Sequence, residues 1–285
     1  MTRRSSGRAK RDVGPRRGSS DPGRGLVVQY TRGVTTRGTS APSGWFITLE
    51  GPDGAGKTRQ AQAIHSRLEQ AGLRVTLVRE PGGTILGERI RDLLLERSGS
   101  GTIQPLTDAL LFNAARAQLV AEVIRPALAR GEVVLCTRFA DSTLAYQGYG
   151  AGLPLDDLRA LERLATGGLT PDLSILLDLP VESGLARKSA DELTRFEAGF
   201  DDAFHRRVRS GFLELARHEP ARFVVVDASP PAEEVFEAIR TALVQRIPEL
   251  AGPLEGARAA AWTDRPLAGR HGADEPDSRP VRTRR

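Results

Sequence analysis

The sequence of 285 residues has a single cysteine, Cys136, and no apolar run that approaches ~20 residues. One cysteine excludes an intramolecular disulfide and fits a reducing cytoplasm. The lack of a long apolar run excludes a membrane-spanning helix, and residues 1–43 contain no apolar core of a signal peptide. We therefore expect a cytoplasmic protein with no membrane partner.

Lysine is scarce as well, because the only lysines are Lys10, Lys57 and Lys188 and the other cations are arginines. In so arginine-rich a chain, a surface arginine alone is weak evidence for phosphate binding. Residues 1–43 carry ten Arg or Lys against two Asp, and residues 250–285 carry seven Arg against five acidic residues. The central part is therefore mildly acidic, and we expect no nucleic-acid partner for the core domain.

Composition divides the chain into three parts. Residues 1–43 are rich in Arg, Gly, Ser, Thr and Pro, and too few large apolar residues are present to offset the entropy of ordering them. We expect a disordered basic tail there. A transit-type tail, a nucleic-acid-binding tail or a start codon placed too early are the alternatives, the last because Met1 is the only methionine. The globular domain is expected over 44–248, followed by a disordered C-terminal tail over 249–285.

Within the central part, short β-branched runs alternate with amphipathic segments, which predicts an α/β fold with a parallel sheet and crossover helices. The predicted strands are 45–50, 73–79, 132–136, 173–179 and 222–227. The predicted helices are 57–71, 84–96, 106–129, 140–147, 155–166, 181–190, 200–218 and 232–246. Ligands of such sheets bind beyond the carboxyl ends of the strands, so the chemistry is expected just after 50, 79, 136 and 179.

The strongest motif is a P-loop directly after the first predicted strand. The octapeptide GPDGAGKT, residues 51–58, matches G-x-x-x-x-G-K-[ST]. Its glycines let backbone N–H groups turn inward around phosphate oxygens. Lys57 brings a positive charge to the β- and γ-phosphates of a nucleotide, and the Thr58 hydroxyl can bind Mg²⁺. The motif predicts a nucleotide-phosphate site that includes a magnesium ion.

Further motifs follow the next two strands. REPGGT, residues 79–84, combines a tight turn with Arg79, whose planar fork suits phosphate. Phe112 and Arg116 share one face of the predicted helix 106–129, so an aromatic ring for stacking lies beside a donor for a base edge. Arg138 follows the third strand, where it can reach phosphates held by the P-loop. In isolation, Phe112 and Tyr146 could be core aromatics and Arg116 a solvated helix residue.

Taken together, these stretches resemble the bacterial thymidylate kinases. The matching segments are EGPDGAGKT, REPGGT, FNAARAQLV, R-x-x-DSTLAYQGYG and TRFE…FHRRVRSGFLELA, in this order from about Trp45 to about Val244. The resemblance implies a P-loop kinase fold with a five-stranded parallel sheet, flanking helices and a lid segment. It also implies transfer of the γ-phosphate of ATP to dTMP with Mg²⁺, and a homodimer.

The resemblance assigns roles residue by residue. The ATP phosphates would be bound by Gly51, Pro52, Asp53, Gly54, Ala55, Gly56, Lys57 and Thr58, with Thr58 also binding Mg²⁺. The acceptor would be bound by Arg79, Phe112, Arg116, Arg138, Ser142, Tyr146 and Gln147. The catalytic residues would be Lys57, Arg138, Asp53 and Arg195. Phe112 would stack on thymine, Arg116 would bond its carbonyl edge, and Arg79 and Arg138 would hold the phosphate of dTMP. Gly54 stands where some relatives carry a P-loop arginine, and the absence of that arginine resembles the bacterial arrangement, in which the lid supplies the cation.

Three positions depart from the family pattern. Thr137 stands before Arg138 where the family has Asp, and Thr194 replaces the Asp of the lid motif Asp-Arg-x-Glu. Ala151 stands where bacterial relatives carry arginine. Loss of charge at a phosphoryl-transfer centre costs on the order of a hundredfold in rate. Three readings stay open: an active dTMP kinase, a kinase for another or modified pyrimidine monophosphate, or a weakened nucleotide-binding paralogue.

Overall fold

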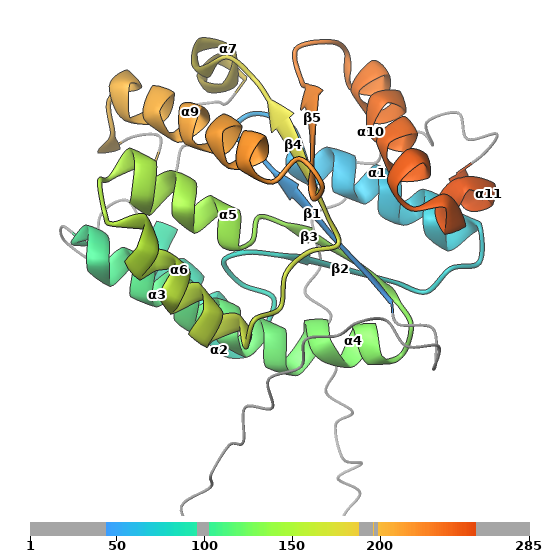
Figure 1. The fold of residues 1–285 in the computed structure, drawn as a ribbon, viewed down its shortest axis with the longest axis horizontal. Coiled ribbons are helices and arrows are strands. Elements are labelled where there is room, and N and C mark those ends of the chain that lie inside the picture. Colours follow the sequence, from blue (N-terminus) through green and yellow to red (C-terminus); the bar gives the residue numbers. More distant parts are fainter. Residues whose placement is uncertain (1–43, 96–102, 188–195, 197–198, 255–285) are drawn as a thin grey trace, which may run out of the picture. The chain divides into compact units, whose positions relative to one another are not determined.

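The computed structural model describes residues 44–95, 103–187, 196 and 199–254. A five-stranded, wholly parallel sheet lies at the centre, in the order β2-β3-β1-β4-β5 (Figure 1). The strands are β1 (Trp45–Glu50), β2 (Val75–Arg79), β3 (Val133–Thr137), β4 (Leu173–Asp178) and β5 (Phe223–Asp227). All five predicted strands are confirmed, with ends that differ by at most two residues, and so is the predicted fold class.

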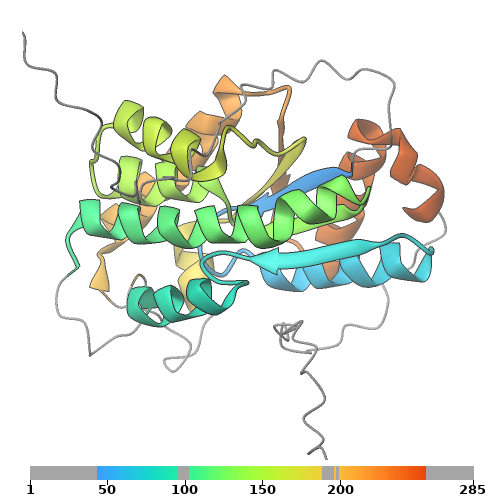
Figure 2. The same cartoon turned by 90° about the horizontal axis from the view of Figure 1, so that it is seen from below.

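Apart from α11, which was not predicted, the helices also fall where periodicity predicts them. They are α1 (Lys57–Gln70), α2 (Ile85–Leu95), α3 (Pro105–Leu119), α4 (Arg125–Ala129), α5 (Ala140–Thr143), α6 (Leu155–Thr166), α7 (Val181–Ala186), α9 (Asp202–His218), α10 (Ala232–Arg246) and α11 (Ala251–Leu254). The predicted helix 106–129 is a single continuous helix (Figure 2), in which a π-helical turn, η1 (Val120–Ile124), separates α3 from α4. The predicted helix 140–147 continues as a second π-helical segment, η2 (Leu144–Gly150).

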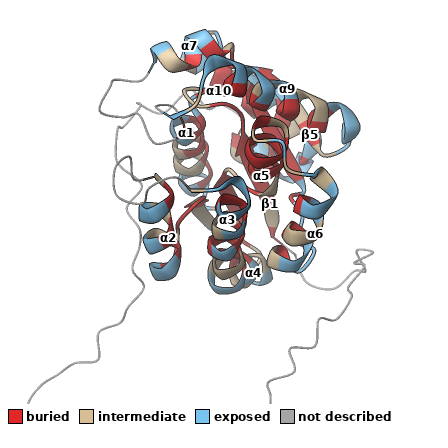
Figure 3. Cartoon of the chain, turned by 90° about the vertical axis from the view of Figure 1, so that its left-hand side faces the viewer, coloured by how far each residue is buried: buried red, intermediate tan, exposed pale blue. Residues whose placement is uncertain are grey.

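The helices cover both faces of the sheet, with α1, α10 and α11 on one face and α3, α5, α6 and α9 on the other (Figure 1). Alternation along β1 explains this division, since successive side chains of a strand point to opposite faces. Ile47 and Leu49 pack with α1 and α10, whereas Phe46 packs with α3 and Phe139. The helices turn their buried sides inward, as the colouring of Figure 3 shows.

The folded domain continues past its predicted end at residue 248. A 3-10 turn, η4 (Pro248–Leu250), leads into α11, and Leu250 and Leu254 are buried in the core between the sheet, α1 and α10. The predicted boundary is therefore at least six residues too early, because the Ala, Gly and Pro of this segment show no helical period. The predicted tails over 1–43 and 255–285 lie outside the described residues.

The sheet brings the predicted motifs to one edge. The P-loop follows β1, the turn of residues 80–84 follows β2, and Arg138 follows β3. Since β3 lies between β2 and β1, these three segments are neighbours. No helix in the described part of the chain is both long and apolar enough to cross a membrane.

Candidate active site

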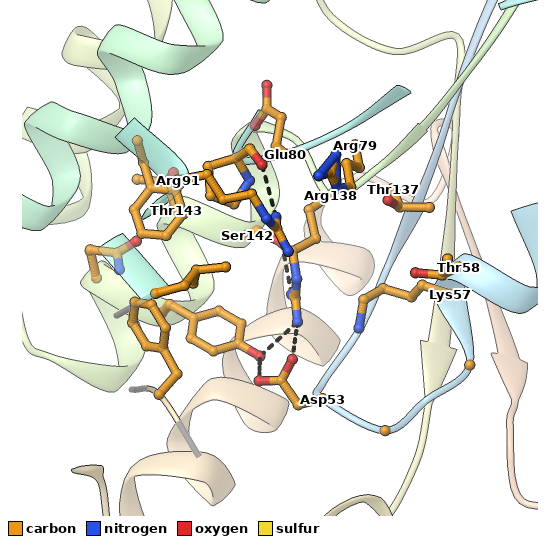
Figure 4. A pocket seen from close by; sticks show the side chains of 18 of the residues that line it. Asp53, Lys57, Thr58, Arg79, Glu80, Arg91, Thr137, Arg138, Ser142 and Thr143 are labelled. Atoms are coloured by element: carbon orange, nitrogen blue, oxygen red, sulfur yellow. Dashed lines mark hydrogen bonds and ion pairs between the residues drawn. The ribbon is translucent and has the colours of Figure 1, made fainter. Parts of the chain in front are cut away.

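A pocket of about 720 Å³ opens at the carboxyl edge of the sheet (Figure 4). It joins the P-loop to the segments after β2 and β3 and to helices α2 and α3. Its lining comprises Asp53, Gly54, Gly56, Lys57, Thr58, Arg59, Arg79, Glu80, Pro81, Arg91, Leu95, Phe112, Thr137, Arg138, Ser142, Thr143, Tyr146, Gln147, Arg187 and Phe196. Most of the predicted site residues therefore meet in one cavity.

The P-loop adopts the backbone that its glycines permit. Gly51, Gly54 and Gly56 have φ values of 134°, 76° and 86°, which side chains disfavour. Gly56 is also the residue that precedes α1, so the first N–H groups of that helix face the loop. The side chain of Lys57 is largely buried and its Nζ donates to the carbonyl oxygens of Gly51 at 2.9 Å and Pro52 at 2.7 Å. The loop forms a positively polarised cradle.

Arg138 occupies the centre of the pocket. Its φ of 69° is the only positive value at a non-glycine residue in the described part of the chain. The guanidinium forms an ion pair with Asp53 and donates to the Tyr146 hydroxyl at 3.1 Å and to Ser142 Oγ at 3.2 Å. Burial alone would lower the pKa of Arg138. The interactions of its guanidinium with Tyr146, Asp53 and Glu50 outweigh burial and raise the pKa, so Arg138 is always positively charged.

A buried carboxylate, Glu50, holds the segment that carries Arg138. Glu50 ends β1 and is fully buried; it accepts hydrogen bonds from the Phe139 N–H at 2.7 Å and from Ser142 Oγ at 2.6 Å. Burial, together with the charge of Asp141, raises the pKa of Glu50 to about 8. Glu50 was not predicted from the sequence, because a glutamate at the end of a strand does not indicate which residues it will contact. Its partners lie 89 and 92 residues further along the chain.

Two arginines lie on the β2 side of the pocket. Arg79 pairs through both guanidinium nitrogens with Glu88, at 3.1 and 3.0 Å. Arg91 of α2 donates to the Pro81 carbonyl oxygen at 2.8 Å. Burial and the neighbouring charges of Arg79 and Arg138 lower the pKa of Arg91 to about 10. Arg91 was not predicted, although its spacing three residues after Glu88 placed it on the same helix face.

Arg116 lies behind the pocket wall rather than on its surface. Its side chain is 1% exposed and pairs with Glu80 at 2.7 Å. The same guanidinium donates to Asn113 Oδ1, Thr143 Oγ1 and the Phe139 carbonyl oxygen, at 3.0 to 3.1 Å. A solvated surface position is therefore excluded. Of these partners, Glu80 and Thr143 line the pocket themselves.

Aromatic rings close one end of the pocket, where the Tyr146 hydroxyl donates to Asp53 of the P-loop at 2.6 Å. Phe112 of α3 lies 5.9 Å from Phe196 between ring centroids, and Tyr146 lies 5.7 Å from Phe196 in an edge-to-face arrangement. Gln147 also lines this end and lies 3.5 Å from Asp108, at the limit of a hydrogen bond. The predicted aromatic residues thus belong to the pocket, although Phe112 and Tyr146 also contact the adjoining core.

The departures from the family pattern have distinct surroundings. Thr137 lines the pocket, where it brings no charge. Asp178, the carboxylate at the end of β4, is bound by Arg209 of α9 at 2.7 and 2.8 Å and does not line the pocket. The carbonyl oxygen of Gly150, the residue before Ala151, accepts two hydrogen bonds from Arg207. Thr194 and the predicted catalytic Arg195 lie outside the described residues.

Comparisons with known proteins find the family that the sequence motifs resemble. A family model described as thymidylate kinase matches residues 49–239. The chain is 53% identical over 204 residues to a thymidylate kinase of Deinococcus radiodurans, a match that covers 71% of this chain and 98% of the relative. It is 52% identical over 209 residues to one of Pseudomonas fluorescens, covering 73% and 98%. A crystal structure of a thymidylate kinase from Ehrlichia chaffeensis matches with a TM-score of 0.58 at 33% identity, covering 71% of this chain and 99% of that one.

Proposed function

The chain belongs to the thymidylate kinase family, and from that premise we propose that it transfers the γ-phosphate of ATP to dTMP with the help of Mg²⁺. The observation that carries the proposal is the shared pocket. Lys57 of the P-loop and Arg138 line one cavity, and Asp53 is paired with Arg138 inside it. A donor phosphate on the P-loop and an acceptor phosphate on Arg138 would therefore meet.

The P-loop suits the phosphates of ATP. A Cβ added to Gly56 would meet no atom within 4 Å, so the space at the mouth of the cradle is open. The N-terminus of the 14-residue helix α1 points its positive dipole end at the same place. Lys57 Nζ donates to two carbonyl oxygens, and when ATP binds it would donate to phosphate oxygens instead.

Thr58 is the proposed protein ligand of Mg²⁺. Its side chain is exposed in the first turn of α1 and lines the pocket. Within the described residues, no group of three His, Cys, Asp or Glu side chains could hold a metal ion without the nucleotide. Magnesium commonly binds through one or two protein ligands plus phosphates and water, so this sparse set fits. Bound there, Mg²⁺ would neutralise charge on the transferring phosphoryl group.

Arg138 and Arg91 are the proposed ligands of the acceptor phosphate. Three cations, Arg79, Arg91 and Arg138, line this part of the pocket, and their mutual repulsion is relieved by an anion. Because Glu88 already accepts both nitrogens of Arg79, we propose that Arg79 contributes charge and orients the turn. Asp53 would then be displaced from Arg138 and turn to the acceptor sugar.

The thymine base is proposed to lie at the aromatic end. Phe112 would stack on the ring, and Tyr146, Ser142 and Gln147 would complete the pocket. Arg116 is buried behind the pocket wall, so we propose that it acts on the carbonyl edge of the base through Thr143. Its guanidinium donates a hydrogen bond to Thr143 Oγ1, and Thr143 lines the pocket. A second aromatic of the pocket lining, Phe196, contacts Phe112, with ring centroids 5.9 Å apart.

Charge at the transfer centre would come from Lys57, Arg138 and the lid residue Arg195. A cation on the lid is required in this proposal, because Gly54 provides none in the P-loop. We propose that Thr137 reduces the rate without changing the acceptor, since its hydroxyl brings no charge to the pocket, and that Ala151, whose N–H donates to the Tyr146 carbonyl oxygen, reduces the rate through the charge it lacks.

A homodimer and a cytoplasmic location complete the proposal. Five leucines are at least 47% exposed on three adjacent helices, namely Leu86 and Leu93 on α2, Leu106 and Leu110 on α3, and Leu164 on α6. Large apolar side chains gathered on neighbouring helices mark a protein interface. A reduced, buried Cys136 is consistent with the cytoplasm.

The test is an assay of the purified protein with ATP and Mg²⁺ against each pyrimidine monophosphate, followed by chromatography of the products. We expect dTDP from dTMP at a rate well above that with dUMP or dCMP. Turnover of a different monophosphate, with none of dTMP, would refute the assigned acceptor. Binding of ATP and dTMP without product would identify a weakened paralogue.

A further inference from the structure

Gly54 at the tip of the P-loop and Gly184 in α7 lie with backbone against backbone. A Cβ added to Gly54 would lie 2.1 Å from the Gly184 carbonyl oxygen, and one added to Gly184 would lie 2.4 Å from the Asp53 carbonyl oxygen. Both distances are far below van der Waals contact. Main-chain atoms cannot move aside as a flexible side chain can, so a side chain at either position would push the loop and the helix apart.

The residue that follows α7 strengthens this contact. Arg187 donates to the carbonyl oxygens of Ala228 at 3.1 Å, Ser229 at 3.3 Å and Gly54 at 3.4 Å. It thus connects the tip of the P-loop to the loop between β5 and α10. On its other side, α7 is linked to α9 by the Glu182–Arg206 ion pair at 3.0 Å. Helix α7 therefore supports the P-loop from outside the nucleotide cradle.

Local preferences do not account for glycine at position 184. Gly184 lies inside a helix, and its φ is not among the positive values that favour glycine. Alanine forms helices better than glycine at such a position. The helix therefore loses stability by having glycine there, and the close approach of Asp53 supplies the reason.

We propose that Gly184 is a positioning residue of the phosphoryl-transfer reaction: the α7 backbone holds the tip of the P-loop in the position in which its N–H groups bind the donor phosphates. This inference rests on the proposed ATP site. It also explains why Gly54 replaces the arginine that some relatives carry, since the Gly184 carbonyl group fills the volume that a side chain at position 54 would need.

The test compares Gly184→Ala with Gly252→Ala in the full-length chain. Gly252 also lies in a helix, but a Cβ there would meet no atom within 4 Å. For Gly184→Ala we expect at least a tenfold rise in KM for ATP and a lower kcat, with KM for dTMP within twofold of wild type. Gly184→Ala should stay folded at the assay temperature, although its melting temperature should fall more than that of Gly252→Ala, whose kinetic constants should match wild type.

A double-mutant cycle with Gly54→Ala separates this role from a general loss of structure. Both substitutions separate the same two surfaces, so the double variant should be affected about as much as the stronger single variant. Wild-type kinetics for Gly184→Ala would overturn the inference. Equal rises of both KM values would also overturn it, because they would indicate a merely structural contact.

Two further variants complete the design. If Gly184→Ala does not fold, Arg187→Lys loosens the same helix while keeping the positive charge that Arg187 brings to the pocket. An unchanged KM for ATP in Arg187→Lys would then refute the inference, and a raised KM would support it. Lys57→Ala distinguishes the two proposals. Loss of activity in Lys57→Ala with none in Gly184→Ala would refute only the role of Gly184, whereas full activity in Lys57→Ala would refute the ATP site itself.

Discussion

At the scale of single residues, the site is organised by buried charged side chains that interact strongly with one another. Arg138 balances Asp53, and Glu50 holds the backbone on which Arg138 sits. Arg116 and Glu80 form a second pair that is almost completely buried. A pair of this kind orients its neighbours more than it stabilises the fold, because desolvation offsets much of the attraction.

Arg91→Ala tests whether Arg91 binds the acceptor phosphate. Loss of one charge-assisted contact to phosphate should raise KM for dTMP at least tenfold, which is about 1.4 kcal/mol, while KM for ATP stays within twofold. Arg89→Ala is the matched control, because Arg89 lies on the same helix and is exposed. Equal effects of the two substitutions, measured by steady-state kinetics, would show that only the net charge of α2 matters.

Glu162→Gln tests the effect of burying a carboxyl group in α6. Burial raises the pKa of Glu162 from 4.5 to about 8, so the folded state retains the proton more tightly than the unfolded state. Below pH 4.5 both states are protonated and the group costs nothing. As pH rises from 4.5 to 8 the stability falls, and above 8 the loss is complete.

Urea unfolding of Glu162→Gln should therefore show little change near pH 4.5 and a gain on the order of 1–3 kcal/mol near pH 8.5. Glu249→Gln, at an exposed position after α10, serves as the control for the loss of one carboxyl group. A loss of stability in Glu162→Gln near pH 8.5 would contradict the expectation.

At the scale of secondary-structure elements, the carboxyl ends of the strands have different roles. The carboxyl ends of β1, β2 and β3 supply the pocket, whereas the end of β4 is engaged with a helix. Asp178 is 21% exposed and bound through both oxygens by Arg209, which ties β4 to α9. This pairing favours a structural role for Asp178 and leaves Thr137 as the position where a carboxylate could act on the metal.

Thr137→Asp should raise kcat several-fold and increase the dependence of the rate on Mg²⁺, with a smaller change in KM for dTMP. The reason is that a charge aimed at the transferring group acts more strongly in a dry site than in water. Asp178→Asn should lower the free energy of unfolding by about 1 kcal/mol and leave the Mg²⁺ dependence as it is. The measurement is a titration of kcat with Mg²⁺ for both variants. No gain in kcat from Thr137→Asp, together with a large loss of kcat in Asp178→Asn, would assign the metal to Asp178.

At the scale of the whole molecule, we propose that the exposed leucines of α2, α3 and α6 form one apolar interface. Leu110→Glu should convert the proposed dimer into a monomer, because a charge in the centre of an apolar interface stays unpaired. Val225→Glu is the control, since Val225 is 48% exposed on the edge strand β5. Sedimentation equilibrium measures the outcome, and a monomeric wild-type protein would contradict the proposed interface.

Local patterns were sufficient for much of the architecture. Five β-branched runs with helical periods between them predicted the parallel sheet and its helices, because a buried strand and an amphipathic helix both leave their period in the sequence. The P-loop could be located to the residue, since its glycines serve a backbone geometry that no other residue adopts at low cost. The resemblance to thymidylate kinases, based on five ordered motifs, is confirmed by the family match.

What the sequence by itself determined, then, is the order of the elements, the P-loop and the family. The tertiary structure alone decided the contacts between residues that are far apart in the chain. Glu50 reaches Phe139, Gly54 touches Gly184, and Arg91 of α2 faces the same pocket as Arg138. Such contacts leave no period and no motif, because they arise when separate elements pack at one edge of the sheet. For the same reason the burial of Arg116 and the extension to Leu254 could be seen only in the folded chain.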